Sequence, residues 1–141
     1  MAKLACILTF VILVLPALPA ASQTAAPDLR GTWKGESESL VSGGGNPHHP
    51  AAQPSAPELR SVPFTLTIDR QDGRRFSGTF SSPRSSEKVI AVISRGGTIF
   101  MADDEGYTNG TLLAPNRMEL CYLHVSSAAR IASCAELTKQ P

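Results

Sequence analysis

The sequence predicts an all-β protein, an eight-stranded antiparallel up-and-down β-barrel that follows an N-terminal signal peptide. From Arg30 onward, apolar residues recur with a period of two, and no segment shows the period of an amphipathic helix. Short stretches rich in Gly, Asp, Asn and Pro separate these runs, so consecutive strands are expected to pair as antiparallel neighbours. Closing such a sheet into a barrel removes both of its exposed edges.

Residues 1–22 have the pattern of a secretory signal peptide. Lys3 supplies a positive charge, Leu4 to Leu15 form an uncharged apolar run, and small residues surround the expected cleavage site, after Ala20 or Ser22. The run is shorter than the roughly 20 apolar residues that a transmembrane helix needs, so an uncleaved anchor is the weaker alternative. We therefore expect a secreted or periplasmic protein with no membrane span in its mature form.

The mature part, residues 23–141, has the size of one domain and no net charge. The whole chain carries 13 Lys and Arg against 12 Asp and Glu, and one of the basic residues, Lys3, lies in the leader. A neutral domain lacks the basic surface that nucleic-acid binding requires, so nucleic acid is not expected as a partner.

The first strand of the barrel has one charged face and one face of small and aromatic residues. Trp33 on the second face is expected to fill one end of the barrel, whereas Ser37 and Ser39 line space toward the other end. The alternative is that large apolar side chains fill this space, namely Phe64, Leu66, Ile68, Phe76, Phe80, Ile99 or Phe100, and Met101. All eight strands are expected at roughly 30–41, 62–70, 74–82, 87–95, 97–103, 106–114, 116–125 and 130–139.

A Gly-, Pro- and His-rich segment, residues 42–61, interrupts the strand pattern and is expected to be a long loop over one end of the barrel. Loops of this length in compact domains are often functional or disordered. His48 and His49 are adjacent, so in an extended chain their side chains point in opposite directions and are poorly placed to bind one ion. We expect solvated histidines here, with no metal site and no cofactor.

The stretch Val89 to Ile93 is apolar on both of its faces. One face of this strand points into the barrel, which leaves the other face exposed on an isolated molecule. Exposed apolar strand faces are typical of interfaces, so this stretch favours a homo-oligomer.

Two cysteines remain after removal of the leader, which contains Cys6, and a disulfide between Cys121 and Cys134 is expected in an oxidising compartment. The bond places a four-residue loop, 126–129, between the last two strands, and closing about 14 residues contributes roughly 3 kcal/mol. The resulting register puts four pairs on the inward face: Met118 with Leu137, Leu120 with Ala135, Tyr122 with Ser133, and His124 with Ile131.

No catalytic motif accompanies these strands. The sequence has no G-x-S-x-G elbow, and its acidic residues fall mainly on outward strand positions or in turns rather than as a converging pair. We therefore predict that the protein is not an enzyme.

Two segments carry a resemblance to known calycin-type barrels. Leu29-Arg30-Gly31-Thr32-Trp33 and Gly78-Thr79-Phe80-Ser81-Ser82 resemble the avidin and streptavidin pattern, and the Gly-x-Trp start is also similar to lipocalins. The resemblance implies an eight-stranded barrel in which Trp33 is the structural tryptophan, Ser82 contacts ligand, and Phe80 stands at the place of a ligand-contacting tyrosine. Gly35 stands where this pattern has an asparagine, and Trp33 is the only tryptophan, so the aromatic box that grips biotin is missing.

These observations favour an exported, non-enzymatic barrel that binds a small ligand near Ser37, Ser39 and Ser82, with polar contacts from Tyr122 and His124. One alternative is a periplasmic inhibitor of a protease or lysozyme that acts through the 42–61 loop. Another is a structural envelope component with a filled barrel and an exposed apolar patch.

Overall fold

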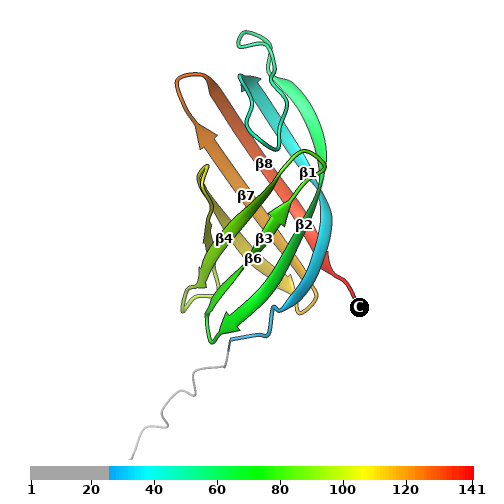
Figure 1. The fold of residues 1–141 in the computed structure, drawn as a ribbon, viewed down its shortest axis with the longest axis vertical. Coiled ribbons are helices and arrows are strands. Elements are labelled where there is room, and N and C mark those ends of the chain that lie inside the picture. The colour runs from blue at the N-terminus through cyan, green and yellow to red at the C-terminus, as the bar shows by residue number, and fades with distance from the viewer. Residues whose placement is uncertain (1–25) are drawn as a thin grey trace, which may run out of the picture.

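Eight strands pair in chain order and close into a barrel in the computed structural model, which describes residues 26–141 (Figure 1). Every neighbouring pair is antiparallel, and β1 completes the barrel by pairing with β8. The strands are β1 (Gly31–Gly43), β2 (Glu58–Asp72), β3 (Arg75–Ser81), β4 (Ser86–Ile93), β5 (Ile99–Ala102), β6 (Tyr107–Ala114), β7 (Arg117–Val125) and β8 (Ala129–Lys139). The predicted fold class is confirmed, while the predicted signal peptide, residues 1–22, lies outside the described residues.

The segment predicted as a loop over residues 42–61 is shorter than expected. β1 continues to Gly43 and β2 begins at Glu58, because Glu58 to Ser61 pair with Val41 to Glu38. The connection between these strands is therefore 44–57. Part of this connection rises above the ends of the two long strands, and part of it turns back toward the barrel, as Figure 1 shows.

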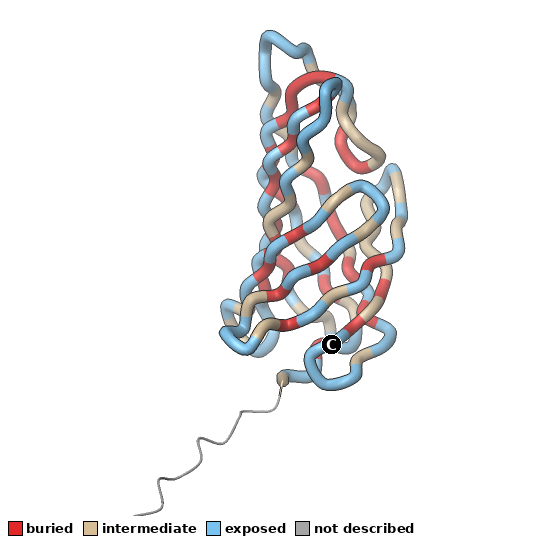
Figure 2. Tube along the Cα trace, turned by 90° about the vertical axis from the view of Figure 1, so that its left-hand side faces the viewer, coloured by how far each residue is buried: buried red, intermediate tan, exposed pale blue. Residues whose placement is uncertain are grey.

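Burial alternates along the strands, as the period-two pattern predicts (Figure 2). On β1, Trp33, Ser37 and Ser39 point inward and are buried, whereas the charged side chains between them are exposed. Gly35 lies on the same inward face. A Cβ at this position would collide with the carbonyl oxygen of Glu136, so the space expected beside it is filled by the backbone of β8.

One end of the barrel is closed by apolar packing around Trp33. Residues 26–30 cross this end, and the Trp33 indole donates a 2.8 Å hydrogen bond to the Leu29 carbonyl. Gln71 accepts a hydrogen bond from the Leu29 amide at 2.7 Å, and Lys139 lies 5.6 Å from the centre of the Trp33 ring. Leu29, Leu66, Ile68, Ile99, Met118 and Leu137 fill the space around the indole.

The last hairpin has the predicted register. Cys121 lies opposite Cys134 and the two form a disulfide, and all four inward pairs expected across β7 and β8 are present. The turn is one residue shorter than predicted, because Ala129 already begins β8 and its carbonyl accepts a hydrogen bond from the Ser126 amide at 2.9 Å.

The outer face of β4 and β5 carries exposed apolar side chains. Val89 and Ile93 point inward and are buried, whereas Ile90 and Val92 are 69% and 45% exposed. Phe100 also points outward, so Ile99 and not Phe100 fills the barrel. The homo-oligomer expected from this patch stays a prediction. No helix within residues 26–141 is long and apolar enough to cross a membrane.

Candidate functional site

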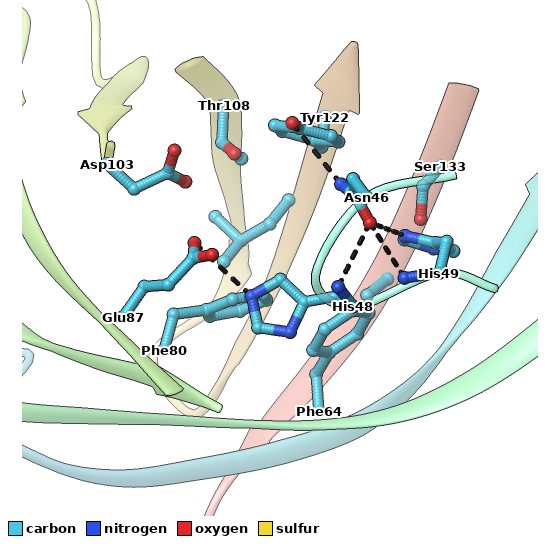
Figure 3. A pocket seen from close by; sticks show the side chains of 12 residues that line it. Asn46, His48, His49, Phe64, Phe80, Glu87, Asp103, Thr108, Tyr122 and Ser133 are labelled. Atoms are coloured by element: carbon cyan, nitrogen blue, oxygen red, sulfur yellow. Dashed lines mark hydrogen bonds and ion pairs between the residues drawn. The ribbon is translucent and has the colours of Figure 1, made fainter. Parts of the chain in front are cut away.

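The end of the barrel opposite Trp33 is lined by polar side chains, and we call it the mouth. Residues 45–50 of the β1–β2 connection fold back into the mouth, and we call this segment the plug (Figure 3). The second part of the connection, residues 51–57, is almost all exposed, with one isolated bridge between Gln53 and Ala56. The two halves of one connection therefore face opposite ways, one into the barrel and one into solvent.

Asn46 shapes the plug. Its side-chain oxygen accepts hydrogen bonds from the backbone amides of His48 at 3.0 Å and His49 at 2.7 Å. The backbone amide of Asn46 donates to the His49 carbonyl at 2.9 Å. Gly43 and Gly45 flank the turn with φ of 85° and 75°, values that favour glycine. This tight turn directs both imidazole rings into the barrel.

Both histidines are therefore buried, with 6% and 2% exposure, and the expectation that they are solvated was wrong. The expectation assumed an extended chain, in which adjacent side chains point in opposite directions. In the observed turn, the Asn46 side chain is hydrogen-bonded to the backbone of both residues, so both rings point into the mouth.

The His48 ring sits between a carboxylate and two aromatic rings. Its Nδ1 and the Ser82 hydroxyl are hydrogen-bonded at 2.8 Å, and its Nε2 lies 3.3 Å from a carboxylate oxygen of Glu87. Phe64 and Phe80 meet the ring edge to face, at centroid distances of 5.4 and 5.9 Å, and stack on each other at 4.6 Å. This is an environment suited to a flat, positively polarised ring.

The His49 ring joins a buried chain of hydroxyl groups. Its Nε2 lies 3.0 Å from the Ser39 hydroxyl, which in turn bonds to Ser37 at 2.9 Å and to Ser133 at 2.8 Å. Burial of the ring, together with the charge of His48, lowers the pKa of His49 from 6.5 to about 4. The neutral imidazole is therefore the form that fits this position.

Tyr122 and His124 form the rim of the mouth on β7. The Tyr122 hydroxyl lies 3.3 Å from the His124 Nδ1 and accepts a hydrogen bond from the Asn46 side chain at 3.5 Å. Burial raises the pKa of Tyr122, and the nearby carboxylate of Asp103 adds to the rise although the Asn46 hydrogen bond opposes it. The phenol therefore stays neutral at physiological pH and can donate or accept a hydrogen bond.

A small pocket remains between the plug and the barrel wall. Its volume is about 30 Å³, room for little more than water. Its lining comprises Asn46, His48, His49, Phe64, Phe80, Glu87, Asp103, Thr108, Leu120, Tyr122, Ser133 and Ala135. The sequence left two alternatives for this end, a polar-lined space or an interior filled by large apolar side chains, and neither describes it fully. Polar side chains line this end, but the plug, Phe64 and Phe80 fill most of it.

All five predicted ligand-contact residues lie at the mouth, although their role as contacts stays a prediction. Tyr122 lines the pocket directly. Ser82, Ser39 and His124 each bond to a residue of the lining, and Ser37 stands one hydrogen bond further away. Trp33 lies at the opposite end, as predicted.

Sequence reasoning missed Glu87, the carboxylate nearest the plug. Glu87 shares the inward face of β4 with Val89, Ala91 and Ile93, as its pairing opposite Phe80 requires. The alternation Glu87-x-Val89-x-Ala91-x-Ile93 was visible in the sequence and would have placed this carboxylate inside the barrel. Asn46 offered no comparable signal, because its role depends on the fold of the plug.

Within residues 26–141 no three metal-binding side chains gather closely enough to hold an ion. The prediction of no metal site stays a prediction.

Comparison with protein-family models finds no match, and comparison with curated protein sequences finds none. Among solved structures, the S-type phycobiliprotein lyase CPES from Guillardia theta is similar with a TM-score of 0.47 and 12% identity. The similarity covers 80% of this chain and 89% of that chain. Nothing about ligands follows from a likeness at this level.

Proposed function

We propose that this protein is an exported, non-enzymatic barrel that binds a small ligand in the mouth. The observation that carries the proposal is the composition of the mouth: an apolar wall that includes Phe64, Phe80 and Leu120, faced by polar groups from the plug and several strands. Ligand sites combine such apolar walls with a few convergent polar groups.

The buried hydroxyl chain also supports a binding role. Ser37, Ser39 and Ser133 occupy inward positions where apolar side chains would contribute burial energy without needing partners. Polar groups in the core must be hydrogen-bonded, and each one left without a partner costs about 1–3 kcal/mol. Departures from an apolar core concentrate at functional sites, and here they concentrate at the mouth.

Export is supported by the leader pattern and by the cysteines. The disulfide between Cys121 and Cys134 joins neighbouring strands, and such bonds persist in oxidising compartments. Both features fit a secreted or periplasmic protein.

Native mass spectrometry of the protein purified from its own cells tests this function. We expect the mass of a chain that begins after Ala20 or Ser22, less two hydrogens because of the disulfide, plus the mass of a bound small molecule. Tyr122→Ala and Ser37→Ala are expected to weaken retention of that molecule. A ligand-free mass, or retention unaffected by both substitutions, would contradict the proposal.

The inhibitor alternative has one supporting observation, the exposure of residues 51–57 above the barrel. A Ser42 hydroxyl bond to the Pro54 carbonyl at 3.1 Å and the Gln53–Ala56 bridge hold this half in shape, as an inhibitory loop requires. Replacing 51–57 with a Gly-Ser linker separates the two functions. Inhibition of a protease or lysozyme would be lost, whereas a ligand held in the mouth would remain.

A further inference from the structure

The plug places one of the protein's own side chains where a ligand would sit, and that side chain indicates the chemistry of the ligand. The His48 ring is buried in the mouth, its Nε2 points at Glu87 from 3.3 Å, and its edges meet Phe64 and Phe80. Figure 3 shows the ring held between the carboxylate and the two phenyl rings.

The His48 Nε2 atom is buried without a well-aligned hydrogen-bond partner. Its 3.3 Å approach to a carboxylate oxygen of Glu87 is therefore a close contact and not a well-aligned hydrogen bond. A partly buried carboxylate favours a cation that can approach it more closely and donate a well-aligned hydrogen bond. The His48 Nε2 lies where such a cation would lie but forms no well-aligned hydrogen bond with Glu87.

Apart from the two histidines, the ionisable acids and bases that line the pocket are all acids. Asp103 lines the pocket with Glu87, Glu105 lies near both, and no Lys or Arg lines this pocket in the described part of the chain. Burial raises the pKa of Glu87, His48 opposes the rise, and Asp103 and Glu105 add to it. A ligand that brings a positive charge would relieve this repulsion, whereas an anion would increase it.

The apolar part of the pocket selects the rest of the ligand. Phe64 and Phe80 present rings whose faces attract cations and whose planes pack against flat groups, and Tyr122 lies across the mouth from them. The space that the His48 ring would vacate favours a ligand about as large as one aromatic ring.

We propose that the mouth binds a small aromatic or heteroaromatic cation, which takes the place of the His48 ring between Glu87, Phe64 and Phe80 when the plug moves out. This inference rests on the proposed function and specifies its ligand class. Asn46 holds the plug in the occupied position through its hydrogen bonds to the backbone amides of His48 and His49.

Calorimetric titration of the purified, oxidised protein with benzylamine and with benzyl alcohol tests the charge. These probes share a ring and differ in charge at neutral pH. We expect benzylamine to bind about tenfold more tightly. Glu87→Gln is expected to remove most of that difference, whereas Glu36→Gln, which alters an exposed carboxylate on the outer face of β1, is expected to leave it nearly intact.

Removal of His48 tests the place of binding. His48→Ala leaves a ring-sized space beside Glu87, so imidazole is expected to bind this variant about tenfold more tightly than the unmodified protein. The double variant His48→Ala/Glu87→Gln is expected to lose this gain. Circular dichroism and the disulfide mass confirm that each variant has folded.

The outcomes separate this inference from the proposed function. If both probes bind equally and Glu87→Gln has no effect, the mouth is a ligand site but the cation class is wrong. If imidazole does not bind a folded His48→Ala variant more tightly, the place of binding is wrong. If neither probe binds any variant and no ligand accompanies the native protein, the proposed function fails as well.

Discussion

The two ends of this barrel are built from the same eight strands but differ in the side chains that fill their interiors. At the closed end, Trp33 and Leu29 are fully buried among apolar side chains, and the indole hydrogen is satisfied by a backbone carbonyl. At the mouth, two imidazoles and three serine hydroxyls occupy the corresponding interior positions, and the segment that fills the space enters from a loop.

Under the proposed function, the closed end supplies stability and the mouth binds the ligand. Apolar burial at the closed end contributes folding energy without requiring partners. The polar interior of the mouth contributes less, because each hydroxyl and imidazole exchanges a hydrogen bond to water for one within the protein. A change at the closed end should therefore act on the whole barrel, and a change at the mouth should act on the plug and on any ligand.

The largest expected effect comes from removing the indole. Trp33→Ala is expected to lower the free energy of unfolding by about 3–5 kcal/mol, because it opens a cavity and leaves the Leu29 carbonyl without its donor. Tyr122→Phe at the mouth is the control and should change the free energy of unfolding by about 1 kcal/mol or less. Urea denaturation measures both, and similar losses would remove the distinction between the ends.

Trp33→Phe provides a second measurement if the alanine variant does not fold. It keeps a ring in the closed end but loses the indole hydrogen bond, so a smaller loss of about 1–3 kcal/mol is expected. A loss below that of Tyr122→Phe would contradict the role assigned to Trp33.

The next largest effect is expected from the disulfide, which lies on β7 and β8 between the two ends. Cys121→Ala combined with Cys134→Ala is expected to cost roughly 3 kcal/mol, because the unfolded chain regains the entropy of the open loop. Chemical denaturation with and without reductant measures the effect. The reductant should destabilise the unmodified protein and leave the double variant unchanged, and an equal response of both would rule out the bond as its target.

The last hairpin also explains how far the sequence could predict the fold. A shift of one residue in the pairing of β7 and β8 would turn every inward side chain outward, so the apolar pattern and the cysteine pair together permitted one register. The same alternation holds on β4, where it would have placed Glu87 inside.

The plug could not be predicted in this way. Its shape depends on one side-chain oxygen of Asn46 that accepts from two backbone amides, and its burial depends on strands far away in the sequence. Periodicity describes strands, and residues 45–50 have none. The two histidines were therefore assigned to solvent, although the space that receives them is bordered by Phe64 and by Ser133 on β8.

The smallest expected effect, a response to pH, is confined to the mouth. His49 has a pKa of about 4 in the folded protein against 6.5 for an ordinary histidine, so the plugged state holds the neutral ring. Its stabilisation is complete above about pH 6.5 and is lost as the pH falls toward 4, because protons bind the ring more readily when it is in water. Acid should therefore release the plug before it unfolds the barrel.

Hydrogen–deuterium exchange between pH 7 and pH 4.5, corrected for the intrinsic rate, measures this release. We expect faster exchange at residues 45–50 and unchanged exchange at residues 31–33 of β1. His49→Gln should weaken the pH response at the plug, because glutamine does not titrate although Glu87 still does, whereas His124→Gln at the rim should keep the response in full. If exchange at both ends rose together, acid would be unfolding the whole barrel, and the mouth would not be the separable part of the molecule that its polar interior indicates.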